Sequence, residues 1–475
     1  MVRKTYEPMG FRNCLTIACC FLPIILFGCG GGGGEGGGGS GGVGGGGPTS
    51  GSGGGQTSAS WAKAYGGSGR DVVHSIQQTS DGGFILVGET FSFGAGNADE
   101  WVVKLEANGT IQWQRAYGGN GYDMAHSIQQ TSDGGYIVAG ESSSFGSSTE
   151  VWVLKLDGNG GITWQNLYGG SGDDVAYSIQ QTSDGGYIVA GETTSYGAVS
   201  VDALVFKLKS DGTIDWWNSY GGANDDRTRS IQQTLDGGFI VAGETNSFGA
   251  GDLDIWVLKL NASGAVTWQK TYAATMDDAA YSVQQTSDGG YIIAGGATVP
   301  GAFLNDVFLL KLDTSGTVVW QHTYGGANDD VAYSVQRTSD GGYIVAGKTS
   351  SFGNVFGDAW VLKVNASGAI VWQKTYGGND SNSAVAIRQT VDGRYVVAGE
   401  TAYFGAGDAD VCVLKLEPTG EIGSGSTLIS TSTATVSTAG FTAGTSSAIV
   451  TPTTPVAPNP TFVSPLDSWA TTTTP

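Results

Sequence analysis

Apolar and polar positions alternate in a repeating block along most of this chain. Each block holds two nearly continuous apolar runs, such as residues 136–139 and 151–154, flanked by two half-polar runs. Apolar runs of this length bounded by Gly-rich turns are typical of strands that are covered on both faces. The pattern predicts four strands per block, which we term A (AYSIQQT), B (GYIVAGET), C (DVWVLKL) and D (from ITWQ to YGG).

A tryptophan in each D run gives the period of the repeat. The seven residues, spaced 52, 51, 52, 52, 52 and 52 positions apart, are Trp61, Trp113, Trp164, Trp216, Trp268, Trp320 and Trp372. A period of about 50 residues filled with short strands predicts the blades of a β-propeller. We interpret the tryptophans as packing between blades rather than as a surface on which a ligand stacks.

The two ends of the repeat indicate how the ring closes. The first block begins with a lone D run over residues 61–67, whereas the last block has Glu421, Ile422 and Gly423 where its own D run should follow. Placing the first run in the last blade would hide open strand edges. We therefore predict an all-β fold, a seven-bladed β-propeller of four-stranded blades over residues 61–423, closed by an N-terminal outer strand in the last blade.

The repeat resembles a known family at this point. The strings DDVAYSIQQTSDGGYIVAGET and DIWVLKLNASGAVTWQKTY are similar to bacterial β-propeller repeats of the SBBP type. That resemblance implies an exported propeller without an assigned reaction. WVLKLDGNGGITWQ also resembles the tryptophan-docking repeat of quinoprotein dehydrogenases and of a propeller lipoprotein scaffold in outer-membrane assembly, although those relatives usually have eight blades. The rhythm is distantly similar to WD repeats, without their Trp-Asp ending.

Residues 1–29 have the pattern of an export signal. Arg3, Lys4 and Arg12 precede an apolar stretch over residues 14–27, which is too short for a typical membrane span. The stretch ends in Leu-Phe-Gly-Cys, which resembles a bacterial lipobox and predicts lipidation of Cys29. An ordinary signal peptide cut elsewhere is the alternative. We expect an exported, membrane-anchored lipoprotein at the outer membrane or cell surface.

Low-complexity segments flank the repeat. Residues 30–60 are rich in Gly and Ser and predict a flexible tether, and residues 424–475 are rich in Ser, Thr and Pro and predict a disordered tail. The net charge of -21 argues against nucleic acid or an anionic membrane surface as partner, so the lipid anchor is the only membrane contact that we expect. Cys412 alone remains beyond Cys29, in the slot that holds Trp in four sister blocks, and predicts a core thiol rather than a disulfide.

Two sets of carboxylates recur at one predicted end of the blades. One precedes each C run, and the other precedes six of the seven A runs. Four residues of the second set, Asp174, Asp226, Asp278 and Asp330, are the candidates for a Ca²⁺ site. We favour instead a role in capping backbone N–H groups of their own loops, because the dense Asp-x-Asp-x-Asp run of calcium loops is missing. The prediction is therefore no metal and no cofactor, with Ca²⁺ as the alternative.

Catalytic groups are hard to assemble from this chain. His74 and His126 occupy a slot that is Tyr in other blocks, which indicates interchangeable packing, and Cys412 has no recognisable partner. Each block also has a Lys in its C run, whose alkyl stem we expect to pack between blades with the charge paired locally or at the rim. We predict that the protein is not an enzyme.

Departures from the repeat mark a candidate ligand patch. Arg227 and Arg229 replace uncharged residues, Trp217 is an extra indole, and Lys348 stands where five copies have Glu. We favour neutral drift between repeats, which would give the same scatter. If the three basic residues share a pocket, they favour an anionic ligand.

The sequence thus predicts a lipid-anchored cell-envelope propeller that is a non-catalytic binding or scaffold module, with an envelope protein or a glycan as partner. One alternative is an extracellular glycan-binding or glycan-cleaving protein that uses the acidic loop face. A purely structural surface component is the other.

Overall fold

The computed structural model describes residues 59–195, 200–249, 253–273, 276–298, 304–402, 405, 408–423, 429–431, 435–437 and 442–444. The predicted signal peptide, Cys29 and the tether up to residue 58 lie outside these residues, so those predictions stay predictions. The described residues contain no helix long and apolar enough to cross a membrane.

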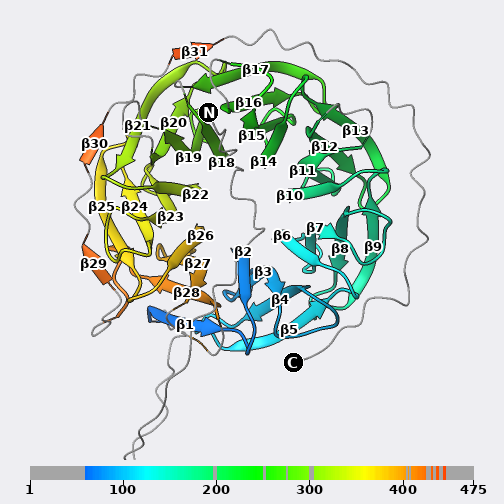
Figure 1. Ribbon diagram of the computed structural model, residues 1–475, viewed down its shortest axis with the longest axis horizontal. Coiled ribbons are helices and arrows are strands. Elements are labelled where there is room, and N and C mark those ends of the chain that lie inside the picture. The colour runs from blue at the N-terminus through cyan, green and yellow to red at the C-terminus, as the bar shows by residue number, and fades with distance from the viewer. Residues whose placement is uncertain are drawn as a thin grey trace, which may run out of the picture. The chain divides into compact units, whose positions relative to one another are not determined.

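Seven antiparallel sheets stand around a common axis as the blades of a propeller (Figure 1). The inner strands are β2 (Asp71–Gln78), β6 (Asp123–Gln130), β10 (Asp174–Gln181), β14 (Asp226–Gln233), β18 (Asp278–Gln285), β22 (Asp330–Arg337) and β26 (Asn382–Gln389). The second strands are β3 (Phe84–Thr90), β7 (Tyr136–Ser142), β11 (Tyr187–Thr193), β15 (Phe239–Thr245), β19 (Tyr291–Thr298), β23 (Tyr343–Thr349) and β27 (Tyr395–Thr401).

The outer half of each blade follows the same order. The third strands are β4 (Asp99–Leu105), β8 (Glu150–Leu156), β12 (Asp202–Leu208), β16 (Asp254–Leu260), β20 (Asn305–Leu312), β24 (Asp358–Val364) and β28 (Asp410–Leu416). The outer strands are β5 (Ile111–Tyr117), β9 (Ile162–Tyr168), β13 (Ile214–Tyr220), β17 (Val266–Ala273), β21 (Val318–Gly325), β25 (Ile370–Tyr376) and β1 (Trp61–Tyr65). We number the blades 1 to 7 by their inner strands, from β2 to β26. The predicted seven-bladed all-β fold is confirmed.

The core lies between blades rather than within them. Every residue of β3 and β4 is buried, because both faces of the sheet are covered by neighbouring blades. One apolar cluster joins Ile85 and Val102 of blade 1 to Tyr136 and Trp152 of blade 2. Sheets covered on both faces require the unbroken apolar runs from which the strands were predicted.

Each outer strand docks on the next blade through its Trp and Tyr. Trp113 meets Tyr136 edge-on, with ring centroids 5.9 Å apart, and the other blades repeat this contact. The hydroxyl of Tyr117 donates to the carbonyl oxygen of Gly160 at 2.6 Å. Equivalent bonds of 2.6–2.7 Å occur in all seven blades, from Tyr65, Tyr117, Tyr168, Tyr220, Tyr272, Tyr324 and Tyr376. The interpretation of the Trp residues as interblade packing is therefore confirmed.

Side chains also join the inner strands, which share no backbone ladder. Gln77 Oε1 accepts the N–H of Gln130 at 2.6 Å, and Ser127 Oγ accepts the N–H of Ile179 at 3.2 Å. Such bonds satisfy backbone donors that would otherwise face the axis without a partner. They recur between most neighbouring inner strands and define the spacing of the blades near the axis.

The lysine of each third strand is buried and paired locally, as predicted. Lys104 is 2 % exposed, and its Nζ lies 2.8 Å from Asp81 in the turn between the inner and second strands. It also donates to the carbonyl oxygen of Leu105 at 3.1 Å. Equivalent ion pairs of 2.6–3.3 Å are made by Lys155, Lys207, Lys259, Lys311, Lys363 and Lys415.

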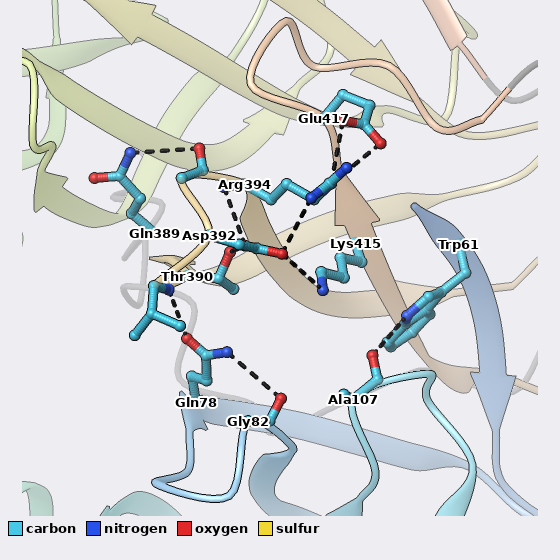
Figure 2. Close-up of polar contacts among 12 residues, drawn as sticks. Trp61, Gln78, Gly82, Ala107, Gln389, Thr390, Asp392, Arg394, Lys415 and Glu417 are labelled. Carbon is cyan, nitrogen blue, oxygen red and sulfur yellow. Dashed lines mark hydrogen bonds and ion pairs between the residues drawn. The ribbon is translucent and has the colours of Figure 1, made fainter. Parts of the chain in front are cut away.

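The first strand closes the ring. β1 pairs antiparallel with β28, from Trp61 opposite Lys415 to Tyr65 opposite Val411, as predicted. Figure 2 shows the seam, where Trp61 Nε1 donates across to the carbonyl oxygen of Ala107 at 3.2 Å. At the same seam Arg394 lies between Asp392 and Glu417, 3.1 Å from each.

Cys412 packs beside an apolar cluster between blades 6 and 7, in the position that holds Trp360 in blade 6. Its side chain is only partly buried, because it lines a small pocket where the larger indole of other blades is missing. Burial nevertheless raises the pKa of the thiol to about 12. The predicted core thiol is thus a half-buried one.

The tail differs from the prediction of disorder in three places. Strands β29 (Ile429–Thr431), β30 (Thr435–Ser437) and β31 (Thr442–Gly444) pair antiparallel with β25, β21 and β17 (Figure 1). The outer strand of a blade leaves an unpaired edge, and Ser, Thr and Val tolerate extended backbone well. A Ser/Thr-rich chain that leaves blade 7 therefore finds edges that it can extend.

We expect the substitution Trp61→Ala to destabilise the fold as much as Trp113→Ala, by about 2–4 kcal/mol each, because both remove an interblade indole. Guanidinium unfolding of the two variants measures this. Trp113 is the internal control for a blade boundary without a seam. A Trp61→Ala variant as stable as the wild type, beside a destabilised Trp113→Ala, would contradict closure by β1.

Candidate functional site

Every inner strand carries a β-bulge at the same place. In blade 1, Val73 pairs with Gly88 and Ser75 with Val87, which leaves His74 outside the ladder. The inner strands border the axis, so the unpaired residues of neighbouring blades come together there (Figure 1). We call these residues the bulge ring: His74, His126, Tyr177, Arg229, Tyr281, Tyr333 and Val385.

The glycine opposite each bulge makes this geometry feasible. A Cβ placed on Gly88 would collide with the backbone carbonyl of Val72, and the same holds for the equivalent glycine of every blade. Gly permits such a close backbone approach. The glycine in the middle of the second strand therefore encodes the bulge, a signal that the repeat pattern alone did not reveal.

Side chains of the bulge ring contact one another around the axis. The imidazoles of His74 and His126 lie 4.9 Å apart, and His126 lies 5.2 Å from the ring of Tyr177. The guanidinium of Arg229 sits 4.4 Å from the centre of the Tyr177 ring, and Tyr281 meets Tyr333 at 5.8 Å. These contacts join the side chains of blades 1 to 4 and, separately, those of blades 5 and 6.

A belt of second-strand residues lies beside the bulge ring. It consists of Glu89, Glu141, Glu192, Glu244, Gly296, Lys348 and Glu400. Arg229 pairs with Glu244 at 2.8 Å and Arg227 with Glu192 at 3.1 Å. Across the seam, Arg70 bridges Glu89 and Glu400 at 3.1 and 3.6 Å. Where an arginine is present, its positive charge offsets the negative charge of the neighbouring belt glutamates.

Burial controls protonation in this region. It lowers the pKa of His74 to about 4, with the nearby Arg70 charge acting in the same direction, and it lowers the pKa of His126 well below its usual range. It raises the pKa of Glu89 and Glu400, against the attraction of Arg70. At neutral pH both imidazoles are therefore uncharged and can donate or accept hydrogen bonds. Aromatic faces, neutral imidazoles and carboxylates suit recognition of a polar ligand.

The candidate patch is only partly brought together. Arg227 and Arg229 lie side by side on β14, both paired with carboxylates. Trp217 instead stacks on Phe206 between blades, with ring centroids 4.5 Å apart. Lys348, on blade 6, donates to Ser381 Oγ at 3.1 Å. The structure thus gives these residues separate roles, and the proposed anion pocket of three basic residues is not formed.

The carboxylates that precede the inner strands tie loops together. Asp71 accepts the N–H of Gly67 at 2.7 Å and the hydroxyls of Thr90 and Ser92 at 2.5 and 2.7 Å. The four calcium candidates lie in four different blades and accept backbone N–H groups: Asp174 from Gly170, Asp226 from Gly222, Asp278 from Thr298 and Asp330 from Gly326. Within the described ranges no group of three or more His, Cys, Asp or Glu could hold a metal ion.

A second carboxylate faces the first one across the loop glycine. A Cβ on Gly118 would meet both Asp99 and Asp123, which shows how closely the two acids approach. Burial, together with the Asp123 charge, raises the pKa of Asp99 to about 7. The same causes raise the pKa of Glu150 to about 7 and of Asp202 and Asp306 to about 6. In most blades, the two neighbouring carboxylates therefore repel each other.

Sequence reasoning assigned the bulge-ring slot to packing. The available signal was the position three residues after the Asp or Asn that begins each inner strand, which holds two His, three Tyr, one Arg and one Val. That diversity contrasts with the Ser and Gln that follow in six of the seven blades.

Comparison with known proteins agrees with the propeller architecture. The family model described as a domain of unknown function (DUF5122) beta-propeller matches residues 182–215, from the turn after β10 to the start of β13. The chain is 25% identical over 353 residues to the "Regulatory protein FlaEY" of Caulobacter vibrioides, a match that covers 60% of this chain and 37% of that protein. The chain thus spans little more than a third of that relative.

Solved structures resemble the chain distantly. Sqt1 from Chaetomium thermophilum is 13% identical, with a TM-score of 0.45 over 75% of this chain and 100% of that one. The periplasmic gluconolactonase PpgL of Pseudomonas aeruginosa is 14% identical, with a TM-score of 0.45 over 76% and 96%. A glucose dehydrogenase is 8% identical, with a TM-score of 0.38 over 75% and 99%. Because these scores lie below 0.5, the fold rests on the strand pairing described above.

We expect the melting temperature to be highest near pH 4 and to fall as the pH rises toward 7. Burial and the neighbouring acid raise the pKa values of Asp99, Glu150, Asp202 and Asp306, so these groups favour the folded state fully below the ordinary values of 3.8 and 4.5, and this stabilisation is lost progressively as the pH rises from about 4 to between 6 and 7. Conversely, hydrogen bonds from Lys104 and Thr79 outweigh partial burial and lower the pKa of Asp81 to about 2, so its stabilisation is lost as the pH falls from about 4 toward 2.

Thermal melts across the pH range measure this curve, and Asp99→Asn should flatten the loss between about pH 4 and pH 7. The exposed Asp408→Asn is the matched control. Equal melting temperatures at pH 5 and pH 8 would refute the assignment of repulsion to the carboxylate pairs.

We also expect the melting temperature to be the same in millimolar calcium and in chelator, because the candidate carboxylates are already engaged by their own loops. Melts at constant ionic strength measure the difference. An increase with calcium that is lost in Asp226→Asn would favour the metal site.

Proposed function

We propose that this protein is an exported, lipid-anchored β-propeller of the cell envelope that binds a partner without catalysing a reaction. The supporting observation is the bulge ring, where equivalent positions of the seven blades carry His, Tyr, Arg or Val, and all of them except Val385 contact a neighbour in the ring. Elsewhere the repeated polar residues serve the scaffold, as the lysine pairs and loop carboxylates do.

The chemistry of the bulge ring favours binding over turnover. His74 and His126 contact each other, and His126 also lies beside the ring of Tyr177 and near the charge of Arg229. The carboxylates next to the ring are held largely by arginines.

We propose an envelope protein or a glycan as the partner. Aromatic faces beside carboxylates and neutral imidazoles can stack on apolar surfaces and bond to hydroxyls or amides. The net charge of -21 disfavours nucleic acid. Lipidation of Cys29 and a flexible tether would hold the propeller near a membrane at the cell surface.

Glycan binding is the second candidate function, and it would use the same surface of the bulge ring. The ring places Tyr177 and Tyr281 near Glu192 and Glu244, so aromatic and acidic groups adjoin. A neutral oligosaccharide would suit this mixture better than a charged polymer.

The test is a binding screen of the mature chain against a glycan panel and purified envelope proteins, repeated with His126→Ala. We expect the dissociation constant of a true ligand to rise at least tenfold, equivalent to about 1.4 kcal/mol. His322→Ala is the matched control, because His322 lies on the outer strand β21 and stacks on Trp320. A ligand whose affinity falls with His322→Ala but not with His126→Ala would place binding away from the bulge ring, and turnover of a bound glycan would overturn the non-catalytic proposal.

A further inference from the structure

A second ring of side chains follows the bulge ring along the inner strands. It consists of Gln77, Gln129, Gln180, Gln232, Gln284, Gln336 and Arg388. We call it the glutamine ring. Blade 7 is the exception, because it places a cation where the other six blades have a neutral amide.

The six glutamines have a defined structural task. Each Oε1 accepts a backbone N–H from the next inner strand, as between Gln284 and Arg337 at 2.6 Å. An amide whose oxygen is engaged in this way keeps its NH₂ group as a hydrogen-bond donor. Arg388 cannot take over this task, because a guanidinium has no acceptor. The seam between blades 7 and 1 therefore lacks the bond that other boundaries have.

The surroundings of Arg388 do not compensate its charge. Its Nη1 donates to the carbonyl oxygen of its neighbour Ile387 at 2.7 Å and to Ser334 Oγ at 3.3 Å. Both acceptors are neutral, and no ion pair of Arg388 is found in the described part of the chain. Burial alone lowers the pKa of this guanidinium.

Two other arginines near the axis have their charge compensated by carboxylates. Arg229 is paired with Glu244 and lies near Glu192, and these carboxylates raise its pKa despite burial. Arg70 bridges two glutamates across the same seam. A partly buried cation without a counter-charge is expensive, since its hydration is lost without an ionic partner.

We propose that Arg388, with the amide donors of the adjacent Gln336 and Gln77, binds an oxyanion at the axis of the propeller. The planar guanidinium fork matches two oxygens of a carboxylate, phosphate or sulfate group. The anion supplies the charge that no side chain provides, and the flanking amides donate to its remaining oxygens. Either a free inorganic ion or an acidic group of a larger ligand has this chemistry. This site is separate from the bulge ring and does not depend on the proposed partner.

The substitution Arg388→Gln tests the site cleanly because it restores the residue of the other six blades. The variant should fold and should be more stable than the wild type in the absence of oxyanions, since the missing seam acceptor returns. Melting temperatures of the full mature chain are measured with sodium phosphate, sulfate or acetate against sodium chloride at equal ionic strength. An anion at ten times its dissociation constant should raise the folded-to-unfolded ratio of the wild type about elevenfold.

Arg337→Gln is the matched control, because Arg337 is an exposed arginine one slot further along its inner strand. It should respond to each anion as the wild type does, whereas Arg388→Gln should show only the general salt effect. Phosphate titration followed by ³¹P line broadening gives a second readout. A response to phosphate and sulfate without acetate indicates a tetrahedral anion, and a response to acetate indicates a carboxylate group. Equal responses of the wild type and Arg388→Gln to all three anions would overturn the proposal.

Discussion

Neighbouring blades share no backbone ladder, so the ring depends on side chains that reach from one sheet to the next. At the rim, Tyr117 and its equivalents donate to a glycine carbonyl of the following blade, beside a Trp packed edge-on against an aromatic ring. Near the axis, Ser and Gln oxygens accept backbone N–H groups of the following inner strand. Because the rim contacts occur at each boundary and the bonds near the axis at most of them, the spacing of the blades is set by local side-chain chemistry.

The two ends of the blades have opposite electrostatic character. At the turn between inner and second strands, Asp81 and its equivalents accept from a buried lysine, which holds their pKa low. At the other end, Asp99 and Asp123 crowd each other and the pKa of Asp99 rises. Ion pairs therefore stabilise one end of the blades, whereas repulsion between neighbouring carboxylates destabilises the other end. The loop glycine between the acids leaves just enough room for both.

Much of the architecture follows from patterns that the sequence displays directly. The Trp period, the unbroken apolar runs and the unmatched strands at either end led to seven blades and closure by β1, because these features reflect burial and pairing that each block must repeat. The pairing of Lys104 followed from its place in a buried strand. The bulge was missed, since its signal is a glycine whose role depends on a carbonyl of another strand. The roles of Trp217 and Lys348 were missed because a departure from a repeat does not reveal which neighbour it contacts. The pairing of β29, β30 and β31 was missed because composition says nothing of the open edges available nearby.

The bulge separates the demands of folding from those of recognition. His74 and its counterparts stand outside the ladder, opposite a glycine that fixes the backbone path, so their exchange disturbs no strand pairing. The propeller thus carries seven variable side-chain positions on a constant backbone scaffold. New binding specificities could arise by combined substitutions at these positions alone, in the way that antibodies vary loops on a constant β-sandwich.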